Sequence, residues 1–256
     1  MLTPVPRLLL VASSLTLGCE QRPTQQSHTE AGESASPALT PSAQAAELRY
    51  APRFDPDNFV RKVDNRFFPL VPGTRYVSVG QSEGEPITNV LLVTHDRKNI
   101  LGISATVVLD RGYVRGELVE KTFDWFAQDK QGNVWYLGED SREIEDGKVV
   151  STEGSWEAGV KGARAGIIMP AHPRPEQHYR QEFFRGEAED EARVTNLDLR
   201  VAVPYASFRG CLRTVEWSRL DPGVTEAKFY CPGVGFVKAR GLEGGDERLV
   251  LKNVFH

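Results

Sequence analysis

Histidines and carboxylates are the side chains of this 256-residue chain that could do chemistry, and their spacing completes no catalytic motif. His172 and His178 flank a proline-containing segment that lacks the H-E-x-x-H pattern of zinc proteases. No G-x-S-x-G pattern marks a serine nucleophile. We therefore expect no catalytic residue, no metal site and no cofactor, and the sequence names no reaction.

An enzymatic alternative stays open. A periplasmic hydrolase or metal-dependent enzyme could combine His172 with Glu157 and a carboxylate from an expected turn at Glu139 and Asp140. A cleft in which this histidine meets two carboxylates would support that alternative.

Ligand binding without catalysis is the favoured interpretation. Residues 154–176 form the least regular part of the domain that follows residue 47. Long irregular loops in compact domains are often functional, so we expect the mouth of a binding site there. The opposing interpretation is that the apolar side chains of this segment, Trp156, Ile167, Ile168 and Met169, only plug one end of the barrel, and that the aromatic residues of the strands are core residues. The candidate ligand-binding residues are Trp125, Trp135, Trp156, Met169 and His172.

The chain begins with a pattern typical of export. Arg7 precedes the uncharged run 8–18, which is shorter than the roughly 20 residues a membrane helix needs and therefore indicates a signal peptide over residues 1–18. The residues before Cys19 resemble the lipobox of bacterial lipoproteins, which implies cleavage before this cysteine and acylation of its thiol. The alternative is an ordinary secretory peptide.

Residues 19–47 are predicted to be a disordered tether that begins at the lipidated Cys19. From Glu20 to Ala46 the chain has no aromatic residue, so it cannot bury enough surface to fold, and its 27 residues would span about 30 Å. Glu20 differs from the aspartate associated with inner-membrane retention, which implies the outer membrane, facing the periplasm. The expected partners are this membrane, through the anchor, and a small apolar ligand or an envelope protein.

The remaining residues, 48–256, are long enough for one domain with an ordinary hydrophobic core. The net charge of the chain is −4, and its basic residues are scattered. Because nucleic-acid binding requires a basic surface, we exclude nucleic acid as a partner.

Cys211 and Cys231 are expected to form a disulfide, because an exported protein meets an oxidising compartment. Residues 209–218 and 225–231 have strand patterns, and an Asp-Pro-Gly turn at 221–223 lies between them. In that antiparallel register position 211 faces position 231, Val215 faces Ala227 and Trp217 faces Thr225.

Strand patterns dominate the domain and predict an all-β fold of about 10–12 antiparallel strands, a meander curled into a barrel or half-barrel. Gly102 and Gly116 are the expected bends of long strands. Asp55 followed by Pro56 predicts one short N-terminal helix that continues towards Val63. Besides the cysteine hairpin, the expected strands include 74–80, 87–95, 100–110, 113–127, 178–185, 192–203, 235–240 and 248–254.

Five segments carry a resemblance to a family. They are NRFFPLVPGTRY (65–76), DWFAQD (124–129), GNVWY (132–136), GIIMPA (166–171) and YCPGVG (230–235), which runs on into the PGVGFV motif at 232–237. Together they resemble a group of uncharacterised exported bacterial lipoproteins. The layout is loosely similar to the curved β-sheets of periplasmic lipoprotein carriers, which implies a cavity for an apolar ligand.

Overall fold

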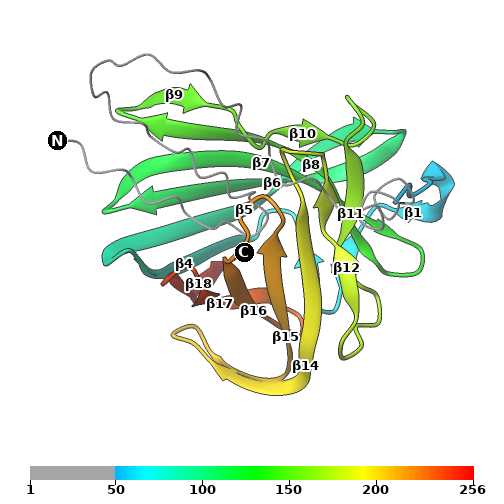
Figure 1. Cartoon of the computed structure of the whole chain (residues 1–256). Coiled ribbons are helices and arrows are strands. Elements are labelled where there is room, and N and C mark those ends of the chain that lie inside the picture. Colours follow the sequence, from blue (N-terminus) through cyan, green and yellow to red (C-terminus); the bar gives the residue numbers. More distant parts are fainter. Residues whose placement is uncertain (1–49) are drawn as a thin grey trace, which may run out of the picture.

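The computed structural model describes residues 50–256 (Figure 1). The predicted signal peptide, the acylated Cys19 and the tether lie outside the described residues. Within the described part, no helix is long and apolar enough to cross a membrane.

The described chain is almost entirely antiparallel β-sheet, as the sequence predicts. Its N-terminal strands are β1 (Phe59–Val60), β2 (Val63–Asn65), β3 (Phe68–Leu70), β4 (Arg75–Ser82), β5 (Glu85–Ile100), β6 (Ile103–Val114), β7 (Glu117–Asp129), β8 (Val134–Glu145) and β9 (Lys148–Ser151). The others are β10 (Trp156–Glu157), β11 (Arg164–Met169), β12 (His178–Arg180), β13 (Glu182–Phe183), β14 (Asp190–Ala202), β15 (Ser207–Ser218), β16 (Thr225–Cys231), β17 (Gly235–Glu243) and β18 (Arg248–Phe255).

One sheet curls into a nearly closed barrel, and 13 strands follow one another around it (Figure 1). The order is β12, β14 to β18, β4 to β8, β11 and β13. At one end of this path β12 pairs with β14, and at the other end β13 pairs with β11. Only Gln181 separates β12 from β13 in the chain. The segment from β12 to β13 therefore joins the two ends of the sheet and gives its strands a common interior.

Two-residue turns ending in glycine connect several of these strands. Leu101 and Gly102 have φ values of 52° and 82°, and Arg115 and Gly116 have 52° and 87°. Two positive φ values in succession fit the twist of a tight hairpin, and glycine adopts the second without strain. The expectation that Gly102 and Gly116 bend continuous strands is therefore wrong, since each glycine lies in a turn between two strands.

The predicted N-terminal helix is only a single 3-10 turn, Pro56–Asn58. The Asp55 side chain accepts a hydrogen bond from the Asp57 backbone N–H, so the predicted cap is confirmed. The chain then becomes extended at Phe59 and pairs with β7, so the expected continuation towards Val63 is wrong. Backbone pairing with an existing strand outweighs the weak local helix signal.

The β2–β3 hairpin fills one end of the barrel. The Phe68 ring lies 5.2 Å from the ring of Phe126 on β7 and 6.5 Å from that of Tyr230 on β16, measured between centroids. Gln128 fixes the hairpin in place, because its side-chain oxygen accepts hydrogen bonds from the backbone N–H groups of Asp64 and Asn65. The core at this end of the barrel is therefore formed mainly by aromatic side chains from strands far apart in the chain.

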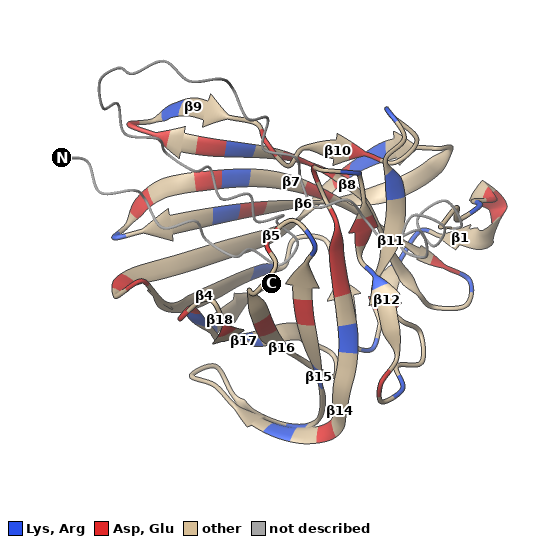
Figure 2. Ribbon diagram, in the orientation of Figure 1, with Lys and Arg blue, Asp and Glu red and all other residues tan. Residues whose placement is uncertain are grey.

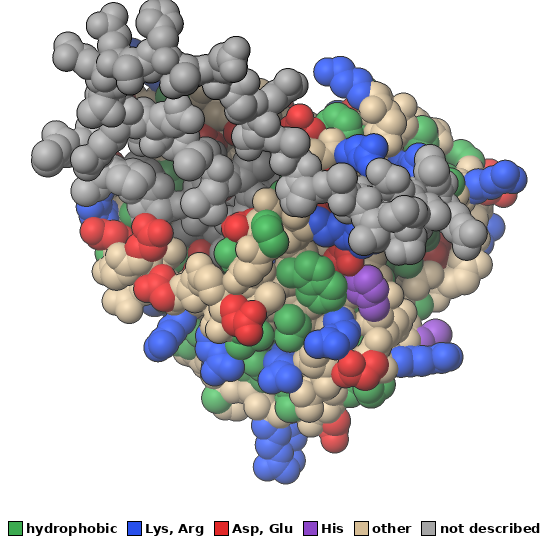
Figure 3. Space-filling model, viewed as in Figure 1, with side chains coloured by type: hydrophobic (Ala, Val, Ile, Leu, Met, Phe, Trp, Pro, Cys, Tyr) green, Lys and Arg blue, Asp and Glu red, His purple; other side chains and the backbone are tan. Residues whose placement is uncertain are grey.

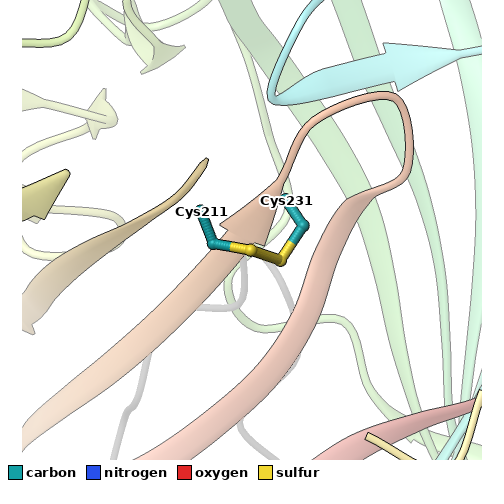
Figure 4. Close-up of a disulfide and its surroundings, with 2 residues drawn as sticks. All are labelled: Cys211 and Cys231. Carbon is teal, nitrogen blue, oxygen red and sulfur yellow. A yellow bond between two sulfur atoms is a disulfide. The ribbon is translucent and has the colours of Figure 1, made fainter. Parts of the chain in front are cut away.

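The cysteine hairpin has the predicted register. Val215 pairs with Ala227, and Cys211 and Cys231 form a disulfide between β15 and β16 (Figure 4). Both cysteines are fully buried. The bond closes a loop with a sequence separation of 20 residues.

Removing the disulfide through a double Cys211→Ala, Cys231→Ala substitution should lower the free energy of unfolding by about 3 kcal/mol, because the unfolded chain regains the entropy of an open loop. Urea denaturation monitored by tryptophan fluorescence measures the loss. Dithiothreitol should destabilise the wild type to a similar extent and leave the double variant unchanged. Equal stability of oxidised and reduced wild type would contradict the prediction.

Candidate functional site

Carboxyl groups from neighbouring strands line the inner face of the barrel. Side chains alternate between the two faces of a strand, and directly paired residues share a face. Asp110 pairs with Thr122, and Asp124 pairs with Glu139, so β6, β7 and β8 each send one of these carboxyl groups inward. Acidic residues appear as red bands on neighbouring strands in Figure 2.

Two of these carboxyl groups have neutral hydrogen-bond donors. The side-chain amide of Asn89 donates to Asp110 over 2.5 Å, and the Tyr136 hydroxyl donates to Asp124 over 2.8 Å. Burial raises the pKa of Asp110 to about 7, although the bond from Asn89 opposes this rise. Burial and the charge of Asp110 also raise the pKa of Asp124.

Glu139 has no such donor. Both of its carboxyl oxygens are buried without a hydrogen-bond partner among the described residues, because the single hydroxyl proton of Tyr136 is donated to Asp124. Burial, and then the neighbouring Glu182, raise its pKa well above the ordinary value. Glu182 itself accepts a hydrogen bond of 2.9 Å from the indole N–H of Trp156. An ionised Glu139 would be costly in this place, so the geometry favours its neutral form.

The other wall of the barrel holds the buried cation Lys228. Its ammonium nitrogen lies 3.0 Å from Glu216 and 3.6 Å from Glu226. Burial alone would lower the pKa of Lys228, and these two carboxylates raise it above its usual value instead. Burial also raises the pKa of Glu226 and of Asp190 to about 7 each. The inner face thus carries more acidic groups than its lysine balances.

These acidic groups do not form a metal centre. Among residues 50–256, no three His, Cys, Asp or Glu side chains are arranged so that they could hold a metal ion. His178 instead binds Glu191 over 2.7 Å and stacks on the ring of Trp217. His172 lies apart, on an exposed loop.

The predicted ligand-binding residues divide into two groups. Trp156 and Trp125 are 4% and 6% exposed. Trp156 packs edge-on against Tyr136 inside the barrel, and Trp125 lies beneath the ammonium group of Lys98, 3.3 Å from its ring centroid. Neither ring faces an open space, and both act as core residues in this structure.

Trp135, Met169 and His172 lie along the paired edges of β8 and β11, or directly after β11. Met169 pairs with Val134 and is fully buried, whereas Trp135 is partly exposed and donates its indole N–H to Asp129 over 2.9 Å. Next to them is an open groove of about 640 Å³. It is lined by Gln131, Asn133, Pro170, Ala171, His172, Arg174 and Gln177.

Two hydrogen bonds shape this groove. The side-chain oxygen of Asn133 accepts from the backbone N–H of Ala171 over 2.9 Å, and that of Gln177 accepts from the backbone N–H of Arg174 over 3.1 Å. The residues after β11 are therefore held against the β7–β8 turn. His172 and Arg174 remain exposed, and no carboxylate lines the groove.

An apolar pocket also exists, but it is small. It has a volume of about 40 Å³ and lies between Phe68, Tyr76, Leu91 and Phe236. This volume is close to that of one or two water molecules, so the pocket as it stands does not accommodate a lipid chain.

The three groups of the enzymatic alternative point to different places. Glu139 lies within β8 and not in a turn, with its carboxyl group inside the barrel. Glu157 pairs with Gly138, the residue before Glu139 on β8, and its carboxylate forms an ion pair of 2.8 Å with Lys98. His172 lines the outer groove, and neither of these two carboxylates is among the residues that line it.

Sequence reasoning missed the inner carboxyl groups as a set. The available signal was an acidic residue placed within an otherwise apolar run, as Asp110 follows Val107, Val108 and Leu109. Such a residue on a buried strand must either find partners or remain neutral.

No known family profile matches the chain, and no curated protein sequence matches it. One similar solved structure, from Bacteroides fragilis, is described as an exported protein with a YmcC-like fold. It is 13% identical, with a TM-score of 0.45, and the alignment covers 75% of this chain and 100% of that chain. A second, described as a lipoprotein from Parabacteroides distasonis, is 12% identical, with a TM-score of 0.37 and coverage of 75% and 99%. These values are too low to indicate a shared function.

The buried carboxyl groups predict that stability falls as the pH rises. A carboxyl group whose pKa is higher in the folded than in the unfolded state binds more protons when folded, so the free energy of unfolding decreases as the pH rises above the unfolded pKa. For Asp110, Asp190 and Glu226 the loss begins near their ordinary values of 3.8 to 4.5 and is complete above about 7. Urea denaturation at successive pH values measures the slope.

An Asp110→Asn variant should lose part of this slope, because an amide cannot ionise but still accepts the hydrogen bond from Asn89. Each pKa unit removed corresponds to about 1.4 kcal/mol, so the gain in stability at pH 8 should be a few kcal/mol. Asp146→Asn, in an exposed turn, is the matched control and should leave the slope unchanged. An unchanged slope in the Asp110 variant would show that this group is ionised in the folded protein.

Proposed function

We propose that this chain is a lipid-anchored binding protein of the bacterial cell envelope, held through Cys19 in the outer membrane and facing the periplasm, and that it is not an enzyme. The anchor is supported by the signal pattern of residues 1–18 and the lipobox-like residues before Cys19. The buried disulfide between Cys211 and Cys231 fits an oxidising compartment outside the cytoplasm.

The binding site is the groove beside β8 and β11, and the observation that carries this assignment is its size together with its lining. About 640 Å³ is within the range of small-molecule sites. His172 and Arg174 are exposed there, and the amide nitrogen of Gln177 is a further donor because its oxygen is already bonded. This lining favours a polar ligand with a phosphate or carboxylate group over a fully apolar one.

The same lining argues for binding without catalysis. General acid–base chemistry needs a proton donor or acceptor that a second group positions, and nucleophilic catalysis needs a nucleophile beside a base. His172 has neither a carboxylate nor a nucleophilic serine or cysteine among the groove residues. The acidic groups inside the barrel belong to the other face of the sheet.

Acylation of Cys19 is tested by metabolic labelling with radioactive palmitate. The wild-type protein should incorporate the label and fractionate with outer membranes, because three acyl chains make attachment effectively permanent. A Cys19→Ser variant should be unlabelled. Label absent from the wild type would leave only a secretory signal and refute the anchor.

Ligand binding at the groove is tested by titration with glucuronate and with inorganic phosphate, using neutral glucose as the comparison. The ring signals of His172 in NMR spectra should shift with the anions and not with glucose. Arg174→Ala should weaken binding about tenfold or more, which is the usual effect of losing one charge-assisted hydrogen bond.

Lys148→Ala is the matched control, because Lys148 is an exposed cation on β9 and does not line the groove. Its affinity should equal that of the wild type. Equal losses in both variants would mean that the anions respond to overall charge, and the groove would then not be their site.

A further inference from the structure

The outer face of β4 to β8 has the opposite character from the inner face. The register aligns three rows of outward side chains across these strands. They are Val77, Val90, Arg111, Lys121 and Arg142 in one row, Arg75, Leu92, Leu109, Phe123 and Asp140 in the next, and Val79, Thr88, Tyr113 and Leu118 in the third. We call these residues the outer basic face. None of them is fully buried, and most are partly exposed.

Positive charge dominates the outer basic face. Four of its residues are cations and one is a carboxylate, Asp140, which is already paired with Arg142 over 2.7 Å. On β7, the inward Glu120 is followed by the outward Lys121, and Figure 2 shows such neighbouring bands of opposite charge on β7 and β8. By contrast, basic and acidic side chains are interspersed on the side formed by β14 to β16 (Figure 3).

The cations of this face lie over apolar and aromatic groups. The ammonium group of Lys121 is 5.0 Å from the ring centroid of Phe123, and the guanidinium group of Arg75 is 4.4 Å from that of Phe255, its partner in the β4–β18 register. The Nε atom of Arg111 is buried and has no hydrogen-bond partner among the described residues. At the boundary between water and lipid, lysine and arginine side chains lay their apolar stems on apolar surface and point their charged ends outward.

We propose that the outer basic face docks on the anionic headgroups of the membrane that carries the lipid anchor. A bilayer surface offers both an extended sheet of negative charge and apolar material beneath it, which matches rows of cations alternating with valine, leucine and phenylalanine. A small anion would use the cations alone and not the apolar residues between them.

The tether makes weak docking sufficient, and in this respect the inference rests on the proposed anchor. The tether predicted from the sequence has 27 residues and would span about 30 Å, which would hold the domain at a millimolar effective concentration near the headgroups. Each basic side chain at an anionic membrane surface increases partitioning about fivefold. Docking would orient the barrel and leave the groove beside β11 accessible, since the groove residues are not part of the outer basic face.

The test uses the exported full chain with Cys19→Ser, so that the face is measured without the acyl anchor. The protein is co-sedimented with vesicles of phosphatidylcholine alone and of phosphatidylcholine mixed with phosphatidylglycerol. Binding should occur only with the anionic vesicles and decrease as salt is raised. Equal binding to both kinds of vesicle, or binding to neither, would overturn the inference. Failed palmitate labelling of the wild type would refute the anchor and leave this result untouched.

Charge reversal locates the surface. Arg111→Glu combined with Lys121→Glu should reduce partitioning to the anionic vesicles at least tenfold, whereas Arg111→Lys should retain it. Lys130→Glu combined with Lys148→Glu changes the same charge at exposed positions outside the face and is the matched control. Thermal unfolding confirms that each variant is folded, and if the first pair does not fold, Arg75→Glu replaces it. Equal loss in test and control pairs would contradict the assignment.

A soluble anionic glycan is the competing occupant. Because heparin offers negative charge without an apolar layer, the protein should bind it more weakly per unit of charge than it binds the anionic vesicles. Tighter binding to heparin than to anionic vesicles at the same total charge would show that the face binds a polysaccharide and would overturn the membrane assignment.

Discussion

Alternation of side chains along the strands of a nearly closed sheet is the constraint on which the rest of this structure depends. Because the β12–β13 segment joins the two ends of the sheet, each of the 13 strands around the barrel has one face towards a shared interior and one face outward. A residue's chemistry is then decided by its parity within the strand. Asp110 and Arg111 are neighbours in the chain and lie in opposite environments.

The interior that results is unusual in its content of acid. Neither carboxyl oxygen of Glu139 has a hydrogen-bond partner among the described residues, and Lys228 has two carboxylates close to it. A buried carboxyl group remains tolerable as a neutral acid, and a buried lysine remains charged only beside carboxylates. Both solutions occur here, on different walls of the same barrel. Since these carboxyl groups lose their protons as the pH rises, the free energy of unfolding depends on the pH of the compartment.

The barrel acts as a frame for features at its edges and outside. The groove lies where the residues after β11 fold back on the β7–β8 turn, and Asn133 fixes their position. The outer basic face belongs to the long strands β4 to β8. If the domain is anchored and binds a polar ligand as proposed, the outer basic face contacts the membrane, and the groove binds the ligand on the periplasmic side.

Particular residues show how far sequence reasoning reached. The paired cysteines and the register of their hairpin were predictable, because the turn at 221–223 sets the pairing of both strands. Gly102 and Gly116 were misread as bends, since a glycine in a continuous apolar pattern gives no local indication of whether the chain reverses there. The candidate ligand residues were chosen by type, and the structure separates Trp125 and Trp156 in the core from His172 at the groove.

The sequence by itself determined the strand content, the antiparallel hairpins and the disulfide, because these depend on side-chain period and on short connections. It also carries the whole of the expectation about export and acylation, on residues outside the described structure. Of the barrel or half-barrel that the sequence predicted, the tertiary structure decided that the sheet is nearly closed. Only the tertiary structure decided the meeting of acidic groups from β6, β7 and β8, and the groove beside β11. Those features join residues far apart in the chain, and the free energy that brings them together comes from packing that no local pattern records.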